Sequence, residues 1–389
     1  MLAWIAPLFV FAIVVFVHEL GHFLAAKAVG VYTPRFSVGF GRALFKKRWG
    51  ETEYILAALP LGGYVRMASK DDEAAAFLEG GSENAATQLT ADGEELDPNA
   101  MIPFGPKPIP ADRWLESKPL WARLTILMAG VTMNVLLALV VTIGMLLYYG
   151  LPYVSTRTEA VLQSRPAAAA GFLPGDSLVA INGVPLTSWD SLVSKISASA
   201  GTEVVFDVQR AGGAKRISVT PGLDTATNLL TGKLERVGRI GILPKALSRP
   251  VTAGEAITHG WTLTWGMAGS VIDALKGLAT RRVPPSELGG PIMIAKASVQ
   301  AAQSGLESLL VLISLISVNL AVFNLLPIPI LDGGQIMVNL LEAIKGSAFS
   351  TRTRDYILRA GIAAVLLLFA LVTYNDLRRL VVSLISKFG

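Results

Sequence analysis

The sequence predicts a multi-pass α-helical membrane protein with about four transmembrane helices, an inserted α/β domain and a membrane-associated β-sheet after the first helix. The chain of 389 residues is 52% hydrophobic and only 16% charged, with a mean hydropathy of +0.52. That composition is too apolar for a soluble protein of this length. Four segments are long and apolar enough to cross a bilayer. Between two of them the pattern changes to short alternating runs separated by Gly, Pro and Asn, which is typical of β-strands.

Each predicted span is an apolar run with aromatic or basic residues near its ends, where interfacial anchors belong. In chain order the spans are residues 1–27, 120–150, 306–335 and 356–375. Basic residues are concentrated in the loops 28–119 and 336–355, which the positive-inside rule places in the cytoplasm. Residues 154–305 then lie outside the cytoplasm, although the basic tail 376–389 disagrees with this orientation. The sequence therefore predicts a protein of the cell (inner) membrane, and its modest charge of +5 gives no indication of nucleic-acid binding.

The first predicted span contains the motif His18-Glu19-Leu20-Gly21-His22. Positions i and i+4 share one face of a helix, so both imidazoles can bind one Zn²⁺ while Glu19 takes a proton from a water at the metal. Ionisable groups at bilayer depth are costly and generally functional. The alternative is a chance match to the motif, but it leaves two of the chain's three histidines in an apolar span without a purpose.

A tetrahedral zinc site needs a third protein ligand besides the two histidines. The chain has no cysteine, so that ligand must offer nitrogen or oxygen. Asp332 follows the apolar run of the third span, which Pro327 and Pro329 interrupt, and it falls on the same predicted side of the bilayer as the motif. Its alternative role is to cap a helix expected over residues 335–344. The remaining histidine, His259, lies on the opposite predicted side and is interpreted as a surface or interfacial residue.

The loop after the first span combines a small β-sheet with a linker. Strand-like runs occur within residues 35–67, where Gly62-Gly63 indicates a sharp turn or a close backbone approach. Residues 69–112 are acidic and then proline-rich, and we expect them to form a mobile linker.

Residues 154–222 are predicted to form the inserted domain. Its segment Ala168–Gly183, which contains G-F-L-P-G-D and ends in I-N-G, resembles the core of a bacterial PDZ domain. PDZ domains bind extended peptides by adding a strand to a sheet edge. The alternative is a structural spacer whose groove is occluded. Residues 223–305 are predicted to contain a strand and amphipathic helices that lie along the membrane surface.

Together these motifs resemble the site-2 protease family, and within it the regulator-of-sigma-E protease subgroup. The resemblance rests on HELGH in the first span, N-x-x-P-x-P-x-L-D-G (Asn324–Gly333) in the third and the PDZ-like insert between them. G-F-G and L-P-L-G-G-Y-V after the first span, and A-G-V-x-x-N (Ala129–Asn134) in the second, are also similar. The chain departs from the family in having one recognisable PDZ domain, where some relatives have two, and in its 69–112 insert.

The resemblance implies an intramembrane zinc metalloprotease and assigns roles to individual residues. The implied metal ligands are His18, His22 and Asp332. Glu19 is the implied catalytic base, and Asn324 the residue that holds an unwound substrate strand. The sheet at Gly62, Gly63 and Tyr64 would pair with that strand by edge addition.

The resemblance also implies regulated intramembrane proteolysis in a stress response. Its expected substrates are single-span membrane proteins, such as an anti-sigma factor-like protein already cut by an upstream site-1-type protease, or remnant signal peptides. Two other functions stay open at this point. A membrane binding module with an inactive zinc site would tolerate substitution of Glu19. A metal-ion transporter would need more ionisable residues inside the spans than the sequence contains.

Overall fold

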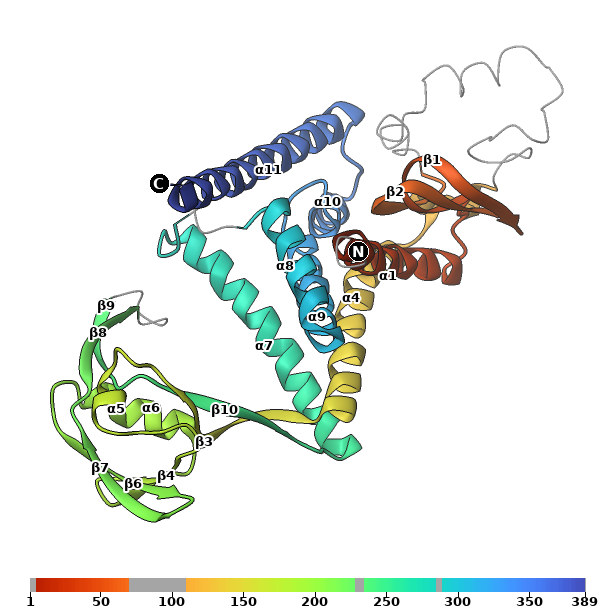
Figure 1. Cartoon of the computed structure of the whole chain (residues 1–389). Helices are drawn as coiled ribbons and strands as arrows, with labels where there is room; N and C mark the ends of the chain where they lie inside the picture. Colours follow the sequence, from red (N-terminus) through yellow and green to blue (C-terminus); the bar gives the residue numbers. More distant parts are fainter. Residues whose placement is uncertain (1–4, 70–109, 228–233, 285–288, 389) are drawn as a thin grey trace. The chain divides into compact units, whose positions relative to one another are not determined.

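The computed structural model describes residues 5–69, 110–227, 234–284 and 289–388, and the chain forms two compact units (Figure 1). One unit comprises residues 1–145 and 257–389, and the other comprises residues 146–256. Most of the linker predicted over residues 69–112 lies outside the described residues.

Within the described residues, four helices are long and apolar enough to cross a membrane. They are α1 (Ala6–Ala28), α4 (Leu120–Tyr149), α9 (Leu306–Asn324) and α11 (Thr351–Phe388). The candidate membrane-spanning segment of α11 covers Arg352–Val382, which is longer than the span predicted over residues 356–375. The helix begins near the end of the predicted loop and continues into the predicted tail because no proline interrupts it.

Helix α1 is the centre of the first unit. It has Pro7 in its first turn and ends before Gly30, whose φ of +75° suits the left-handed conformation of a helix end. Val10 and Val14 pack against Ile313 of α9 and Leu137 of α4 in a buried cluster. These contacts hold the helix that carries the HExxH motif against α4 and α9.

The third span ends earlier than predicted. Helix α9 stops at Asn324 and α10 (Asp332–Lys345) begins after a short connection. Two prolines in the connection remove backbone donors and prevent a continuous helix. A Cβ at Gly333 or Gly334 would collide with backbone atoms of residues 325–329, so only glycine permits this tight fold-back. The fold-back returns Asp332 toward α1.

Two helices occupy the stretch in which the sequence predicts amphipathic helices, namely α7 (Ala253–Ala279) and α8 (Pro291–Ser304). The carboxylate of Asp376 in α11 accepts hydrogen bonds of 2.9–3.0 Å from the backbone N–H groups of Gly290, Ile292 and Met293. This carboxylate satisfies the first N–H groups of α8, which a helix leaves unpaired.

The small sheet is formed by two bent strands, β1 (Arg35–Trp49) and β2 (Thr52–Arg66), which pair antiparallel. Each residue of Arg35–Val38 has one partner in residues 53–56 and another in residues 63–66. The end of β2 is therefore an outer edge of the sheet, and it packs against α1 (Figure 1). Two short 3-10 turns, η2 (Ala111–Arg113) and η3 (Leu115–Ser117), lead into α4.

In its described residues, the second unit is a β-sheet domain with the two helices α5 and α6. Its elements are β3 (Leu151–Val161), α5 (Pro166–Ala169), β4 (Ser177–Ile181), β5 (Val184–Pro185), α6 (Trp189–Ala198), β6 (Val204–Arg210), β7 (Gly213–Val219), β8 (Gly222–Thr227), β9 (Leu234–Arg239) and β10 (Ile242–Arg249). The main sheet has the order β10-β3-β4-β6-β7. The unit extends beyond the predicted residues 154–222 because β10 pairs with β3, and Ile240 completes a core that contains Leu178 and Phe206.

Candidate metal centre

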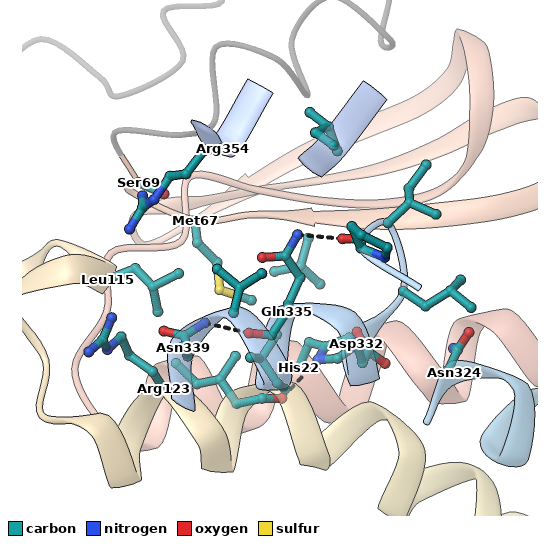
Figure 2. A pocket seen from close by; sticks show the side chains of 18 of the residues that line it. His22, Met67, Ser69, Leu115, Arg123, Asn324, Asp332, Gln335, Asn339 and Arg354 are labelled. Atoms are coloured by element: carbon teal, nitrogen blue, oxygen red, sulfur yellow. Dashed lines mark hydrogen bonds and ion pairs between the residues drawn. The ribbon is translucent and has the colours of Figure 1, made fainter. Parts of the chain in front are cut away.

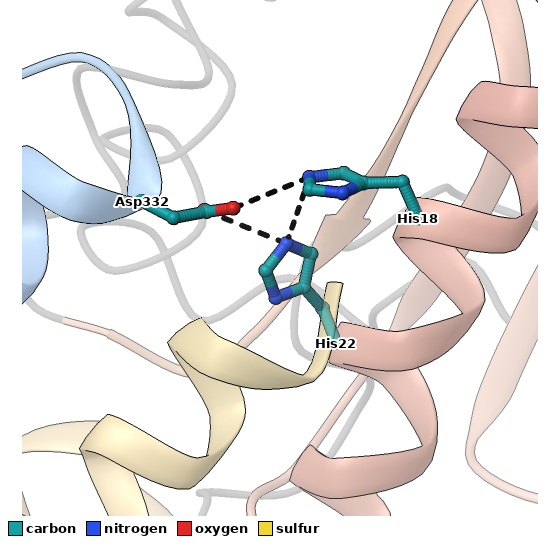
Figure 3. Close-up of side chains that lie close together, drawn as sticks. All are labelled: His18, His22 and Asp332. Carbon is teal, nitrogen blue, oxygen red and sulfur yellow. Dashed lines mark hydrogen bonds and ion pairs between the residues drawn. The ribbon is translucent and has the colours of Figure 1, made fainter. Parts of the chain in front are cut away.

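Three side chains from two distant parts of the chain meet at one point (Figure 3). His18 and His22 lie one turn apart on α1, and Asp332 is the first residue of α10. The Nε2 atoms of the two histidines are 3.2 Å apart. Asp332 Oδ2 lies 3.3 Å from His18 Nε2, and Asp332 Oδ1 lies 3.5 Å from His22 Nε2. Among the described residues, these three form the group of side chains able to hold a metal ion.

The geometry of this group suits a tetrahedral zinc ion. Ligand atoms about 2.0–2.1 Å from such an ion lie roughly 3.3 Å from one another, which is close to the three separations found. In the part of the chain that the structure describes, the buried Asp332 Oδ2 has no hydrogen-bond partner, and a cation held between the three side chains would compensate its charge. The N-cap of α10 is Leu331, and no side chain caps the helix. The alternative role of Asp332 as a helix cap is therefore wrong.

Each histidine has a second polar neighbour on α4. His22 Nδ1 lies 2.8 Å from the backbone carbonyl of Ile126, which can only accept a hydrogen bond. That contact places the proton on Nδ1 and leaves the Nε2 lone pair for a metal. His18 Nδ1 lies 3.4 Å from the amide nitrogen of Asn134. At the other nitrogen of the same ring, the amide nitrogen of Asn324 lies 3.0 Å from His18 Nε2.

Helix α4 reaches the histidines because small residues line the contact. A Cβ at Gly130 would collide with His22 Nε2 and would lie 2.8 Å from His18 Cε1. A Cβ at Gly21 would collide with the backbone carbonyl of Ala129. Close helix contact through small residues is common in membrane proteins. The sequence assigned no role in the site to Gly130, although the residue belongs to the family-like segment A-G-V-x-x-N (Ala129–Asn134) of the second span.

The metal centre opens into a cavity of about 690 Å³ (Figure 2). Glu19 lines the cavity beside the three ligands, and Tyr64 of β2 and Asn324 of α9 line it as well. A Cβ at Gly63 would lie 3.2 Å from the Glu19 side chain, so the edge of the sheet directly adjoins the proposed base. Gly62 packs instead against the ring of Phe40.

Charged residues line the cavity farther from the ligands. Arg123 of α4, Glu342 of α10 and Arg354 of α11 belong to its wall, and Figure 2 shows Arg123 and Arg354 on the opposite side from Asn324. Glu342 and Arg354 form an ion pair of 2.8 Å. Burial would raise the pKa of Glu342, but the N–H of Phe349 and the Arg354 guanidinium together hold that pKa below its usual range. The cavity thus combines an apolar wall with a charged region, and water can occupy it.

Most of the site residues predicted from the sequence lie around the same cavity. His18, Glu19, His22, Tyr64, Asn324 and Asp332 line one cavity. Gly63 adjoins Glu19 from the sheet edge. His259 lies in α7 and does not belong to the metal-binding group found among the described residues.

Comparison with known proteins identifies the family. Residues 6–368 match the family described as peptidase family M50. The chain belongs to this family. The regulator of sigma-W protease RasP from Bacillus subtilis is 29% identical over 97% of this chain and 98% of its own length. The zinc metalloprotease RasP from Bacillus licheniformis is 30% identical over 97% of this chain and 99% of its own length.

Among solved structures, the PDZ domain of the SdrC-like protein from Listeria innocua matches 25% of this chain and 99% of its own chain. The identity is 20% and the TM-score is 0.19, which by itself establishes no shared fold.

The M50 family membership confirms the resemblance to the site-2 proteases and the prediction of an enzyme. The protein is a metalloprotease, and its metal is zinc, as the names of its relatives state. The donor set found here, two imidazoles and a carboxylate with no cysteine in the chain, suits that metal.

Proposed function

We propose that this metalloprotease cleaves a peptide bond inside a transmembrane segment of a single-span membrane protein, with zinc held by His18, His22 and Asp332. One observation carries the proposal. Two of the three ligands lie in the middle of α1, a helix apolar and long enough to span a bilayer, and the third is returned to them by the fold-back after α9. A hydrolytic centre at that depth acts on a segment in the membrane.

Zinc, when bound, acts as a Lewis acid that polarises the scissile carbonyl and makes water more acidic. Glu19 is the base that accepts a proton from the attacking water and returns one to the leaving amine. Its place in the wall of the cavity beside the ligands supports this role. The charged part of the cavity gives water a route to a site that is otherwise enclosed by apolar helices.

The substrate must unwind before it is cut, because the carbonyl groups of a helix are hydrogen-bonded internally. Among the described residues, the end of β2 at residues 63–66 pairs with Arg35–Val38 on one side, and it lies next to Glu19. An extended substrate strand can therefore add to its other side. Gly62 and Gly63 keep this edge free of bulky side chains, while Tyr64 lines the cavity. Asn324 projects its amide toward the ligands and is suited to hold the substrate backbone.

The protein is proposed to be a multi-pass protein of the cell (inner) membrane, with the metal centre toward the cytoplasm. Four candidate spans support the membrane location, and the basic residues of loops 28–119 and 336–355 support the orientation. The membrane location is also supported by the exposed apolar side chains at the far end of the sheet, where Leu44, Phe45 and Trp49 are 69%, 60% and 79% exposed. The second unit is proposed to be the PDZ-like domain on the opposite side of the membrane.

The proposed substrates are anti-sigma factor-like proteins, already shortened by an upstream site-1-type protease, or remnant signal peptides. The name of the Bacillus subtilis relative, regulator of sigma-W protease, supports the first class. No nucleic acid is expected to bind.

The test is cleavage of a single-span reporter in proteoliposomes, with the cut located by mass spectrometry. Wild type is expected to cut within the apolar segment, and Glu19→Gln is expected to bind zinc without cutting. Glu307→Gln, at the exposed start of α9, is the matched control and is expected to cut like wild type. Cleavage by Glu19→Gln, or cuts confined to the soluble flanks of the reporter, would refute the proposal.

A further inference from the structure

Asn134 is a fully buried asparagine in the middle of α4, with 0% of its surface exposed. Its amide nitrogen lies 3.4 Å from Nδ1 of His18. Its amide oxygen is buried and has no hydrogen-bond partner in the described part of the chain. A polar side chain in an apolar helix needs a partner to compensate its burial. The proton requirements of His18 identify that partner.

His18 directs Nε2 toward Asp332 and His22, so a metal at this centre would be bound through Nε2. A neutral imidazole that binds a metal through Nε2 carries its proton on Nδ1. The Nδ1–H group then needs an acceptor, because metal-binding histidines almost always donate their second N–H to a carbonyl, carboxylate or water. The amide nitrogen of Asn134 is a donor and cannot fill this role.

Rotation of the amide of Asn134 by half a turn exchanges its oxygen and nitrogen without altering its shape. The oxygen then faces Nδ1 of His18 and accepts its proton. The same rotation gives the buried oxygen the donor that it lacks. One change therefore satisfies both the Nδ1–H group of His18 and the amide oxygen of Asn134.

The position of Asn134 on α4 fits this role. Ile126, Gly130 and Asn134 recur every four residues and so lie on one face of the helix. Ile126 offers its carbonyl to His22, Gly130 allows the close approach, and Asn134 faces His18. The backbone carbonyl of Asn134 also accepts a hydrogen bond of 2.8 Å from Ser317 of α9, which fixes this point of α4.

We propose that Asn134 is a positioning residue of the metal centre, whose side-chain oxygen accepts a hydrogen bond from Nδ1–H of His18 and holds the ring for metal binding through Nε2. The proposal rests on the ligand set proposed above. It predicts that a hydrogen-bond acceptor at position 134 is needed for tight binding of zinc, independently of any substrate.

The test measures Zn²⁺ affinity of the purified full chain in detergent by competition with a chromophoric chelator, and records the absorption spectrum of the Co²⁺-substituted protein. Asn134→Leu has similar size and no acceptor, whereas Asn134→Asp keeps an acceptor and has no amide donor. We expect Asn134→Leu to bind Zn²⁺ about 10–100-fold more weakly with an altered Co²⁺ spectrum, and Asn134→Asp to bind within a few-fold of wild type.

Asn319→Leu is the matched control for the loss of an asparagine whose amide oxygen is buried. Asn319 lies in α9, its amide oxygen is also buried without a partner, and it forms no hydrogen bond with His18 or His22 in the described structure. This variant is expected to bind Zn²⁺ like wild type.

Two results would overturn the role of Asn134. One is wild-type affinity in Asn134→Leu, and the other is an Asn134→Asp variant that is as weak as Asn134→Leu, because the asparagine would then act as a donor or by shape. The Zn²⁺ affinity of His18→Ala distinguishes a wrong role for Asn134 from a wrong set of metal ligands. If His18→Ala binds Zn²⁺ like wild type, the ligand set itself is wrong and the role of Asn134 falls with it.

Discussion

Replacement of Gly130 by alanine is expected to disable the metal centre through a single methyl group. The added Cβ would collide with His22 Nε2 and lie 2.8 Å from His18 Cε1, whereas ordinary contacts begin at 3.4 Å. The rings must therefore recede by at least about 0.6 Å, since Gly130 belongs to a helix backbone that cannot yield easily. Zinc–ligand distances tolerate changes of only about 0.2 Å.

The expected cost follows from this displacement. Misplacement of reacting groups by about 1 Å can reduce rates by about 100-fold, which corresponds to about 2.7 kcal/mol of transition-state stabilisation. We expect kcat/KM for a transmembrane reporter to fall at least 100-fold in Gly130→Ala. The zinc content of the purified variant should also fall below one ion per chain.

Gly144→Ala is the matched control, because Gly144 lies in the same helix and a Cβ there meets no atom within 4 Å. This variant should cut at the wild-type rate, and its helix should gain up to about 1 kcal/mol because alanine has the higher helix propensity. A Gly130→Ala enzyme with a full zinc content and a rate within about threefold of wild type would refute the close packing of α4 on the histidines.

Three further predictions concern other parts of the molecule. Burial would raise the pKa of Asp176, but the ion pair with Arg210 and the N–H of Leu173 hold that pKa below its ordinary value of 3.8. The carboxylate therefore stabilises the second unit above about pH 4, and this stabilisation should be lost as the pH falls through the lowered pKa. Thermal unfolding between pH 3 and 7 should show that loss, and less of it in Arg210→Met. Asp376→Ala removes the acceptor for three N–H groups at the start of α8 and should lower unfolding free energy in detergent by about 1–3 kcal/mol. Gly63→Val brings a side chain against the Ser37 carbonyl and Glu19, and it should slow cleavage while zinc content stays normal.

Each of these three has a contradicting result. If wild type and Arg210→Met lose stability equally at low pH, the ion pair is not the cause of that loss. An unchanged unfolding free energy in Asp376→Ala would mean that water replaces the carboxylate. Loss of zinc in Gly63→Val would indicate that the sheet edge supports the metal ligands rather than the substrate and the base.

The sequence contained the local parts of the site but not the contacts between distant segments. His18 and His22 are four residues apart in an apolar run, so helical periodicity alone predicts that they share a face. Asp332 was assigned from the cost of a carboxylate at the end of a span. The fold-back that returns it to α1 depends on the fit of Gly333 and Gly334 against the preceding backbone, which no periodic pattern encodes.

The contribution of α4 was not predicted for a similar reason. The segment A-G-V-x-x-N (Ala129–Asn134) is similar to the family, but the sequence does not show which helix its glycine and asparagine face. Gly130 and Asn134 acquire a role only once α4 lies against α1. The end of the second unit was also missed, because β10 joins the sheet beside β3, a strand far from it in sequence.

The most direct test of the central claim is X-ray absorption at the zinc edge of the purified protein in detergent. The proposed site predicts one zinc ion per chain, with two imidazole nitrogens at about 2.0–2.1 Å and a carboxylate oxygen at about 2.0–2.2 Å. His22→Ala should lose the ion or one of the two imidazole signals. A wild-type protein without zinc, or a zinc spectrum that His22→Ala leaves unchanged, would contradict the assignment of the metal centre.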